Sequence, residues 1–216
     1  MVDFFKIMLD QKAKIDGIQT RDINKLLQLN IAKKCGLLIP ETLITEYGRD
    51  ARKFLKNKNV ITKSIQVPFS LVDKKNVYDL MTFNLNPSDL KGKKIFFLSK
   101  IQEKIEKEFE LRIFYLNGTF YPMAIFSQNN PKTKLDFRNY DRVNPNRNVP
   151  FKLPRLIQNK LRLFMKEINL KSGSIDMIVA KNGAYNFLEV NPVGQYGMVS
   201  IPCNYFLDKI ICEELI

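Results

Sequence analysis

The stretch Ser174–Pro192, SIDMIVAKNGAYNFLEVNP, predicts a β-hairpin, and the interpretation of the whole chain starts from it. At its centre, Asn182-Gly183 is the dipeptide most typical of a two-residue hairpin turn, and both flanks are rich in strand-forming residues. If Asn182 and Gly183 form the loop, counting outward from the turn places Asp176 directly opposite Glu189. The sequence therefore predicts two carboxylates side by side on one face of a sheet.

With that turn, Lys181 faces Ala184, and Asn191 lies on the same face as the two carboxylates. Like charges directly opposite each other destabilise an antiparallel pair unless something neutralises them. A divalent cation would do so, and carboxylates with a side-chain amide are oxygen ligands suited to Mg²⁺. We therefore predict that Asp176, Glu189 and Asn191 bind a metal. The alternative is that one carboxylate is protonated or paired with one of the many lysines.

The opposite face of this hairpin is apolar. Ile175, Met177 and Val179 alternate with other residues in the first strand, and Leu188 and Val190 are their expected partners in the second. An apolar face indicates that the hairpin packs on a core, so that its polar face is turned toward a site. This pattern favours the metal interpretation over an incidental surface pair.

Composition limits the possible chemistry. The chain has 216 residues, of which 45% are hydrophobic, enough to build one large domain or two small ones. It contains no histidine, which excludes Ser-His-Asp triads, Cys-His dyads and histidine-ligated metals. The formal net charge of +13 predicts an anionic partner, which could be nucleic acid, nucleotide phosphates or an acidic peptide.

No segment of the sequence indicates export or membrane insertion. The longest apolar run, Ile95–Leu98, is too short to span a bilayer, and the start Met1–Lys6 lacks the basic region of a signal peptide. The cysteines Cys35, Cys203 and Cys212 are odd in number and widely spaced, which is typical of reduced packing residues. We expect a cytoplasmic protein.

Periodicity predicts the other helices and strands. The expected helices are 4–15, 23–32 with Asp22 as cap and Cys35-Gly36 as end, 48–57, and 154–169 with Leu156, Ile157, Leu161, Phe164 and Ile168 as its buried stripe. The expected strands are 42–45, 60–63, 77–85 and 94–98, followed by a second Asn-Gly hairpin over 111–116 and 119–125. In that hairpin Pro122 argues for an edge position or a bulge. Residues 127–150 are expected to form a long polar loop with some strand, and such loops are usually functional or mobile.

The signature loops of common nucleotide-binding and hydrolase folds, Walker A, Gly-x-Gly-x-x-Gly and Gly-x-Ser-x-Gly, do not occur in this sequence. An ordered series of short motifs occurs instead: Asn24-Lys25, Gly36–Pro40, Lys63 at the end of a strand, Gln102-Glu103, Glu110-Leu111-Arg112, Asp136–Asn139, Asp176, and Glu189–Pro192. In this order the motifs resemble those of the ATP-grasp ligases, over nearly the whole chain from about Asn24 onward.

Within that family the chain is most similar to the graspetide (microviridin-like) peptide maturases of the grasp-with-spasm type. The similar phrases are Thr133–Arg138, Ser174–Ile178, Phe187–Met198 and Pro202–Tyr205. The resemblance implies an α+β chain with the ATP-grasp fold, in which two subdomains with antiparallel sheets grip ATP. The implied parts are a linker helix (1–16), an N-terminal subdomain (17–100) and a C-terminal subdomain with the metal site (101–216).

The resemblance also implies a role for each motif. The residues implied to bind ATP are Lys25 and Lys63 at the phosphates and Gln102, Glu103, Lys104 and Ile105 at the adenine, with Glu103 or Glu110 near the ribose. Asp176, Glu189 and Asn191 would hold Mg²⁺, while Arg112 and Arg138 would be catalytic and face the transferred phosphate. Arginine suits that task because its planar fork pairs bidentately with phosphate or carboxylate oxygens.

Several of these residues have a structural alternative. Lys25 could lie on a solvated helix face, Arg112 could form a structural ion pair near Glu110, and Arg138 could belong to a merely mobile loop. Gln102-Glu103 could be an ordinary helix start. These alternatives predict different partners for the same side chains.

By the same resemblance, the chain is an ATP-dependent ligase that forms ester or amide cross-links in an acidic, ribosomally made precursor peptide through an acyl phosphate. Its cofactors would be ATP and Mg²⁺. Two alternatives stay open: a non-catalytic basic module that binds RNA or a leader peptide on an ATP-grasp scaffold, and a ligase that adds a free amino acid to a protein terminus. Neither a membrane nor a nucleic acid is the expected partner.

Two features depart from the resemblance. The family normally has an α/β domain before the ATP-grasp core, so we expect a separate N-terminal domain or second subunit to complete this chain. Residues 64–85 also lack the glycines of a flexible loop that covers phosphate. We therefore expect the chain alone to be an incomplete catalyst.

Overall fold

The computed structural model describes residues 14–16, 23–65, 70–72, 77–79 and 82–216. The predicted linker helix (1–16) lies outside the described residues except for its last three positions. The chain divides into two compact units, unit 1 (Met1–Ile39 with Lys107–Ile216) and unit 2 (Pro40–Glu106). Each unit is described by itself.

The first described helix, α2 (Lys25–Lys34), is part of unit 1 because it contacts β11 and α4. The subdomain limits 17–100 and 101–216 group this helix differently and stay a prediction. Asn24 caps α2, since its side-chain oxygen accepts the backbone N–H groups of Leu26 at 2.9 Å and Leu27 at 3.1 Å. The predicted cap, Asp22, lies outside the described residues.

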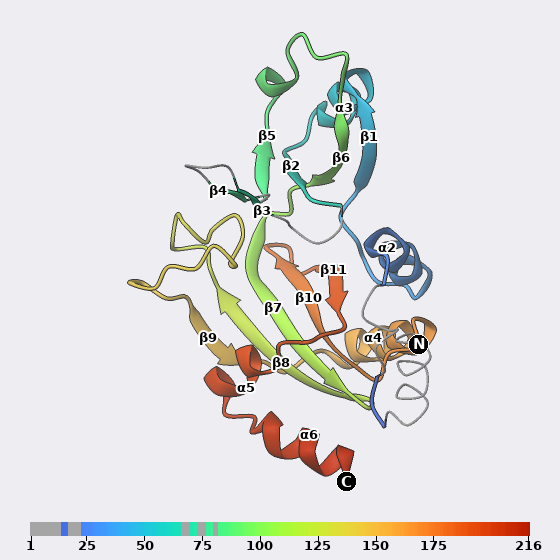
Figure 1. The fold of residues 1–216 in the computed structure, drawn as a ribbon, viewed down its shortest axis with the longest axis vertical. Helices are drawn as coiled ribbons and strands as arrows, with labels where there is room; N and C mark the ends of the chain where they lie inside the picture. The colour runs from blue at the N-terminus through green and yellow to red at the C-terminus, as the bar shows by residue number, and fades with distance from the viewer. Residues whose placement is uncertain (1–13, 17–22, 66–69, 73–76, 80–81) are drawn as a thin grey trace. The chain divides into compact units, whose positions relative to one another are not determined.

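Unit 1 is built on a five-stranded antiparallel sheet with the order β11-β10-β7-β8-β9 (Figure 1). Its strands are β7 (Lys107–Leu116), β8 (Thr119–Phe126), β9 (Arg147–Pro150), β10 (Ser172–Ala180) and β11 (Tyr185–Asn191). The central strand β10 pairs with β7 on one side and with β11 on the other. The predicted α+β class with antiparallel sheets is confirmed.

One face of this sheet carries the main core. Successive side chains of a strand point to opposite faces, and Leu111, Ile113 and Ile175 lie on the face that packs against α2 and α4 (Arg155–Glu167). Helix α4 agrees with the predicted helix in position, but its buried residues are Leu161, Phe164 and Met165. The predicted stripe was wrong at Leu156, which is 64% exposed.

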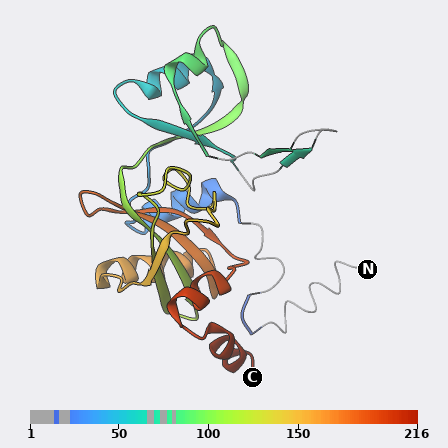
Figure 2. The same cartoon turned by 90° about the vertical axis from the view of Figure 1, so that its left-hand side faces the viewer.

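The other face mixes apolar contacts with charge. Phe114 and Leu116 pack against α6 (Leu207–Leu215), and Met123 and Ile125 pack against α5 (Gly197–Cys203). Figure 2 shows α5 and α6 from a second direction, below the sheet of unit 1. Arg112, between two core positions of β7, points to this second face and begins the charged row described below.

Hairpin β7–β8 agrees with its prediction, with Asn117 and Gly118 at the turn. The expected edge position of Pro122 was wrong, because β8 lies between β7 and β9. The ring is tolerated because the ladder between β8 and β9 begins only at Met123. The carbonyl of Pro122 instead accepts the N–H of Phe151 at 3.0 Å and the hydroxyl of Tyr205 at 2.6 Å.

Unit 2 holds a four-stranded antiparallel sheet with the order β1-β6-β2-β5. Its elements are β1 (Thr42–Tyr47), α3 (Gly48–Leu55), β2 (Val60–Lys63), β5 (Phe83–Leu85), η2 (Pro87–Leu90) and β6 (Ile95–Glu103), with a two-stranded pair of β3 (Ser70–Val72) and β4 (Val77–Asp79). Helix α3 and η2 pack on the large sheet around Ala51, Leu90 and Ile101.

Two strand predictions in unit 2 need correction. The strand expected over 77–85 is divided into β4 and β5, which pair in different sheets. Strand β6 continues to Glu103, so the helix start considered for Gln102-Glu103 is wrong. None of the helices in the described part of the chain has the length and apolar character needed to cross a membrane.

Candidate functional site

The predicted opposition of the two carboxylates is confirmed. In the β10–β11 ladder, Asp176 pairs with Glu189, and Ser174 pairs with Asn191. Because these two pairs are two residues apart along each strand, their side chains share one face of the sheet. The hairpin therefore places Asp176, Glu189 and Asn191 together.

The route to this register differs from the prediction. The residue that faces Ala184 is Ala180, not Lys181: the N–H of Ala180 donates to the carbonyl of Ala184 at 2.9 Å, and the N–H of Gly183 donates to the carbonyl of Ala180 at 2.8 Å. Three residues thus form the loop, and Gly183 takes the left-handed conformation with φ +81°. The two-residue loop was wrong.

A bulge restores the register further along the hairpin. Met177 pairs with Phe187 while Asp176 pairs with Glu189, which leaves Leu188 as the extra residue of β11. Leu188 is therefore half-buried, and Phe187 takes the core position, packing edge-on against Phe164 with ring centroids 4.7 Å apart. The expectation that Leu188 belongs to the apolar face was wrong.

Strand β7 adds a cation to the row. Arg112 lies directly opposite Asp176, and its Nη1 is 2.8 Å from both carboxylate oxygens. Only 4% of Arg112 is exposed, and its Nη2 donates to the carbonyl of Gly194 at 3.5 Å. The Nε of Arg112 is buried and has no hydrogen-bond partner among the described residues. A buried N–H donor without an acceptor is costly, and an anionic ligand oxygen would satisfy it.

Burial also perturbs Asp176 itself. Removal from water raises the pKa of its carboxyl, and the nearby charge of Glu189 acts in the same direction, whereas Arg112 and Arg138 oppose the rise. The carboxylate is therefore retained by its cationic neighbours, and its charge depends on them.

Glu189 is bound by cations from two other elements. Its Oε2 is 2.9 Å from Nζ of Lys25, and its Oε1 is 3.8 Å from Nη1 of Arg138. Helix α2 is docked for this contact by Gln28, whose side chain accepts the N–H of Val190 at 2.9 Å and donates to the carbonyl of the same residue at 3.1 Å. Glu189 thus has a lysine partner, and its role as a metal ligand stays a prediction.

The loop between β8 and β9 presents Arg138 in a defined position. Its Nε and Nη2 donate to the carboxylate of Asp136 at 2.9 and 2.7 Å, and its backbone N–H donates to the same group at 3.1 Å. The hydrogen bond to Asp136 raises the pKa of Arg138 above its ordinary value, so the guanidinium is always charged. Arg138 is thus oriented by a neighbour in its own loop, and the alternative of a mobile loop stays a prediction.

Glu110, implied to lie near a ribose, is engaged elsewhere. Its Oε1 is 2.6 Å from Nζ of Lys107, and Ser127 donates its hydroxyl to the other oxygen. Lys107 also donates to the carbonyl of Leu135 at 3.1 Å. Burial raises the pKa of Glu110 despite the lysine. This cluster ties the loop that carries Arg138 to β7, a role that the sequence did not indicate, since Lys107 and Ser127 match no motif.

A metal ion fits this site only if the charges of the site stay balanced when it binds. Asn191 and the two carboxylates are oxygen donors of the kind Mg²⁺ prefers, and the amide nitrogen of Asn191 already points to Asp176 at 3.4 Å. However, the carboxylates of Asp136, Asp176 and Glu189 are balanced by Lys25, Arg112 and Arg138. No group of three or more acidic or cysteine side chains that could hold a metal occurs in the described ranges. A divalent ion therefore fits if it arrives with its own anion.

The remaining predicted residues belong to unit 2. Lys63 ends β2 and is half-buried, and Gln102 is buried with its side chain donating to Thr42 at 2.9 Å. The backbone N–H groups of Glu103 and Lys104 donate to Glu41 and Asn59 at 2.8 and 2.9 Å, and Ile105 is half-buried. The amides predicted to hold adenine are thus partly used within the unit.

The chain matches no protein-family model and no curated protein. Among solved structures it is similar to the RiPP-associated ATP-grasp ligase of Chryseobacterium gregarium in complex with ADP and a leader and core peptide. The identity is 27%, the TM-score is 0.77, and the match covers 88% of this chain and 57% of that one.

It is also similar to the macrocyclase MdnC of Microcystis aeruginosa MRC bound with the precursor peptide MdnA, at 30% identity and a TM-score of 0.78, covering 93% of this chain and 62% of that one. The ATP-grasp ligase PsnB, complexed with a phosphomimetic variant of its minimal precursor, Mg and ADP, is 19% identical with a TM-score of 0.71, and the match covers 89% of this chain and 57% of that one. At that identity the likeness to PsnB shows the fold alone.

The chain spans less than two thirds of the length of these proteins. Within that span, the resemblance to peptide-modifying ATP-grasp ligases predicted from the motif series is confirmed.

Proposed function

We propose that this chain, which has the ATP-grasp fold, is an ATP-dependent ligase that forms ester or amide cross-links in a ribosomally made peptide. The observation that supports it best is the row of Arg112, Asp176 and Glu189, flanked by Lys25 and Arg138. This is a buried, charge-balanced site in which the N–H donor at Nε of Arg112 has no acceptor. The similar ligases complexed with ADP and with leader, core or precursor peptides point to the same chemistry.

The reaction needs no nucleophile from the protein. An oxygen of a substrate Asp or Glu carboxylate attacks the γ-phosphorus of ATP, the bond to the β,γ-bridging oxygen breaks, and ADP leaves. A substrate hydroxyl or amine then attacks the acyl carbon, loses its proton, and releases inorganic phosphate as the acyl–oxygen bond breaks. Catalysis in such a site is positioning and charge stabilisation, which a chain without histidine can supply.

The arginines would act on the transferred phosphate. Nε of Arg112 is a buried donor with a fixed direction, because the rest of the guanidinium is held by Asp176. Arg138 is oriented by Asp136 in the same way. Pre-oriented donors lose little entropy when charge develops on the phosphate, and for this reason they stabilise a transition state.

Asp176, Glu189 and Asn191 would hold Mg²⁺, and the ion would neutralise negative charge on the phosphate oxygens when bound. Because the site is already balanced, the ion and the triphosphate are expected to enter together. Lys25 would then exchange its partner: its Nζ, now 2.9 Å from Glu189, would move to a phosphate oxygen as the carboxylate turns to the metal. This reconciles the predicted phosphate role of Lys25 with its observed ion pair.

In unit 2, Lys63 is proposed to bind phosphate, and the segment from Gln102 through Glu103 and Lys104 to Ile105 is proposed to bind adenine. The backbone N–H groups of Glu103 and Lys104 are engaged within the unit, and Nζ of Lys104 donates to Asn84 at 2.8 Å. Glu110 is not proposed as a ribose ligand, because both of its oxygens are bonded within unit 1.

The proposed peptide substrate is acidic, in keeping with the net charge of +13. A cytoplasmic location remains a prediction.

Thermal unfolding with millimolar Mg-ADP tests the proposal, because a ligand that binds only the folded state raises its melting temperature. We expect a rise with Mg-ADP, a smaller rise with ADP in EDTA, and none with Mg²⁺ alone. The same melting curves are measured for Glu189→Gln. Its matched control is Glu213→Gln, a change on the exposed face of α6. A melting temperature unaffected by Mg-ADP would contradict the ligase function.

A further inference from the structure

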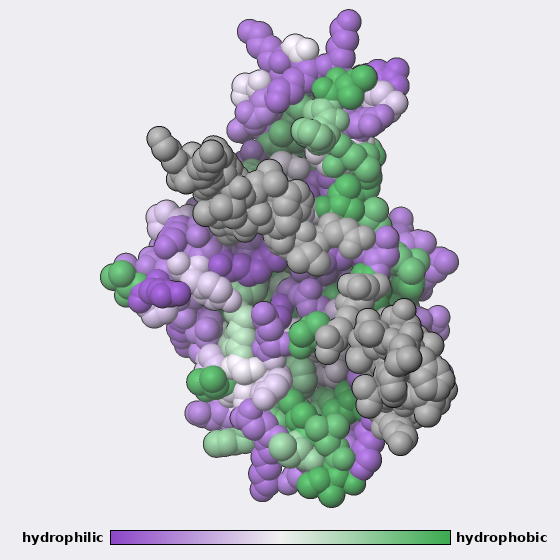
Figure 3. All heavy atoms as spheres, viewed as in Figure 1, coloured by the Kyte–Doolittle hydropathy of each residue, from purple (hydrophilic) through white to green (hydrophobic). Residues whose placement is uncertain are grey.

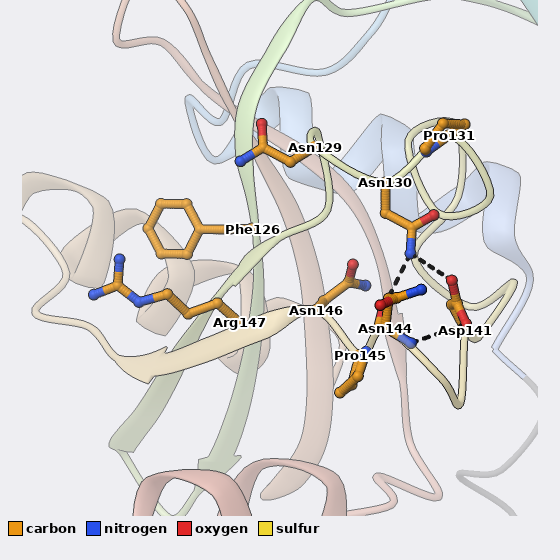
Figure 4. A pocket seen from close by; sticks show the side chains of 9 residues that line it. All are labelled: Phe126, Asn129, Asn130, Pro131, Asp141, Asn144, Pro145, Asn146 and Arg147. Atoms are coloured by element: carbon orange, nitrogen blue, oxygen red, sulfur yellow. Dashed lines mark hydrogen bonds between the residues drawn. The ribbon is translucent and has the colours of Figure 1, made fainter.

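A second concave region of unit 1 lies in the loop between β8 and β9. The cavity shown in Figure 4 has a volume of about 650 Å³, within the range of roughly 300–1,000 Å³ typical of ligand sites. Its lining residues are Phe126, Asn129, Asn130, Pro131, Asp141, Asn144, Pro145, Asn146 and Arg147. It begins where the ladder ends, since Phe126 and Arg147 are the last pair of β8 and β9.

A smaller cavity of about 270 Å³ adjoins the first and shares two of its residues, Phe126 and Asn129. Three lysines and one carboxylate line it, Lys107, Lys134, Lys181 and Glu108. The two cavities therefore adjoin each other at Phe126 and Asn129. On the face seen in Figure 3, the surface over this loop is mostly hydrophilic.

The framework of the large cavity is built from polar groups that are already satisfied. Asn130 donates to Asp141 at 2.9 Å and to the carbonyl of Asn144 at 3.0 Å, as the dashed lines in Figure 4 show. The bond from Asn130 lowers the pKa of Asp141, and so do the bonds that its carboxylate accepts from the backbone N–H groups of Asn144 and Val143. Thr133 donates to the side-chain oxygen of Asn146 at 2.8 Å and to the carbonyl of Ser127 at 3.2 Å.

Other polar groups of the lining are not used by the protein. The side chains of Asn129 and Asn144, and the Nδ2 of Asn146, make no hydrogen bond with the described residues. An amide side chain has the same donor and acceptor groups as a peptide bond, so these three can bond to an extended backbone. The lining also includes the aromatic residue Phe126.

Two cations at the cavities also lack ion pairs. The guanidinium of Arg147 lies 5.4 Å from the centroid of Phe126, where a cation–π contact fixes its position, and it has no carboxylate partner in the described part of the chain. The ammonium of Lys134 likewise pairs with no described carboxylate. Lys107 differs, because Glu110 neutralises it. Arg147 and Lys134 therefore remain to pair with carboxylates of a ligand.

We propose that these two cavities form a binding site for an acidic peptide segment, whose backbone bonds to the asparagines and whose carboxylates pair with Arg147 and Lys134. The inference rests on the proposed function, since it names where the peptide substrate is held. The same loop carries Arg138, two residues from Asp136, and Lys107 of the small cavity bonds to Leu135. A peptide bound here would lie along the segment that presents the catalytic arginine.

The test is the binding of two short fluorescent peptides, one rich in Glu and Thr and one with Gln in place of every Glu, measured by anisotropy at low salt. The protein should bind the Glu peptide more tightly than the Gln peptide. In the double variant Arg147→Gln with Lys134→Gln, affinity for the Glu peptide should fall roughly tenfold. Asn144→Asp should also weaken it, because it places a like charge in the cavity.

The matched control is Arg155→Gln with Lys166→Gln, two exposed positions of α4 whose loss changes the net charge equally. Its affinity should change by less than about twofold. Equal losses in both double variants, or no binding of the Glu peptide to the unaltered protein, would overturn the inference. So would a single-stranded RNA that binds as tightly and shows the same loss at Arg147 and Lys134.

The melting temperature with Mg-ADP separates this inference from the proposed function. The Arg147 and Lys134 double variant should keep the full rise, since neither residue belongs to the nucleotide site. If the double variant kept both the normal rise in melting temperature and an unchanged peptide affinity, the peptide site alone would be refuted. If Mg-ADP did not raise the melting temperature of the unaltered protein, the ligase function would be refuted.

Discussion

The two Asn-Gly hairpins of unit 1 start from the same dipeptide and differ in regularity. Hairpin β7–β8 turns on Asn117 and Gly118, both with positive φ (43° and 92°), and pairs without interruption as far as Glu110 and Ile125. Hairpin β10–β11 turns on three residues, of which only Gly183 has a positive φ, and its ladder contains a bulge. The dipeptide thus predicts a turn but not its length.

The irregular hairpin is the one that carries the two carboxylates of the charged row, Asp176 and Glu189. A bulge bends its strand and re-aims the side chains beside it. Here it compensates for the extra loop residue, so that Glu189 returns to the face of Asp176 and Arg112. We infer that the register at the site is maintained by the buried side chains with which each hairpin pairs. Variants in the two hairpins test this inference.

The largest effect is expected from Arg112→Leu, because it leaves the buried carboxylate of Asp176 without its partner. Breaking a buried ion pair costs roughly 3–5 kcal/mol, and we expect the free energy of unfolding in urea to fall by that amount. Adding Asp176→Asn should recover much of the loss. Thr119→Ala, an exposed position in the regular hairpin, should change stability by less than about 0.5 kcal/mol. Equal costs at Arg112 and Thr119, which both belong to hairpin β7–β8, would show that the ion pair of Arg112 with Asp176 does not stabilise the fold.

Glu189→Gln should act mainly on catalysis. Turnover of ATP with a substrate peptide should fall roughly a hundredfold to a thousandfold, the effect of losing one pre-oriented electrostatic group. The fold should lose about 1–3 kcal/mol, because Lys25 and Arg138 lose their shared acceptor. Glu213→Gln on α6 should alter neither value. Near-normal turnover in Glu189→Gln would remove Glu189 from the proposed metal site.

Local sequence signals predicted much of this fold. Alternation and turn residues identified both hairpins, and periodicity with Pro and Gly boundaries predicted α2, α3, β2 and α4 nearly in full. Failures occurred where pairing partners decide the outcome. Strand β6 continues to Glu103 because β1 and β2 pair with it on either side, and Leu156 is exposed although its spacing fits a buried stripe.

Local pattern alone predicted the site only within one hairpin, whereas Lys25, Arg112 and Arg138 were named from the resemblance of the motif series. The opposition of Asp176 and Glu189 depends on a few neighbouring residues and could be counted from the turn, although a loop error and a bulge cancelled. The partners of both carboxylates come from distant segments: Arg112 through the pairing of β10 with β7, and Lys25 through the docking of α2 by Gln28. Local periodicity contains no information on such contacts, so the sequence could not choose between a metal and a cation at Glu189.

If Lys25 exchanges its partner as proposed, Lys25→Met should change the affinities for a free metal ion and for Mg-ADP in opposite directions. These changes should be smaller than the effects above. Lys25→Met frees the carboxylate of Glu189, so Mn²⁺, read by electron paramagnetic resonance, should bind the nucleotide-free protein about tenfold more tightly. Mg-ADP should bind more weakly, because a phosphate contact is lost. Lys33→Met, at the other end of α2, should leave both affinities unchanged. A loss of affinity for both ligands would refute the exchange.

The smallest effects distinguish the two turns directly. Asn117 has a positive φ, in which alanine is strained, so Asn117→Ala should cost about 1–2 kcal/mol. The bond from its amide to Glu214, 2.5 Å, is lost equally in Asn117→Gly, which carries no strain and should be the more stable of the two.

Asn182 has no positive φ, and its side chain accepts the N–H of Ala184 at 3.1 Å. There the order reverses, because glycine adds only conformational freedom to the unfolded chain and should cost roughly 0.5–1 kcal/mol more than alanine. Urea unfolding of the four variants measures both differences. If glycine were better than alanine at both positions, the two loops would have the same conformation, and the compensation between loop and bulge would be wrong.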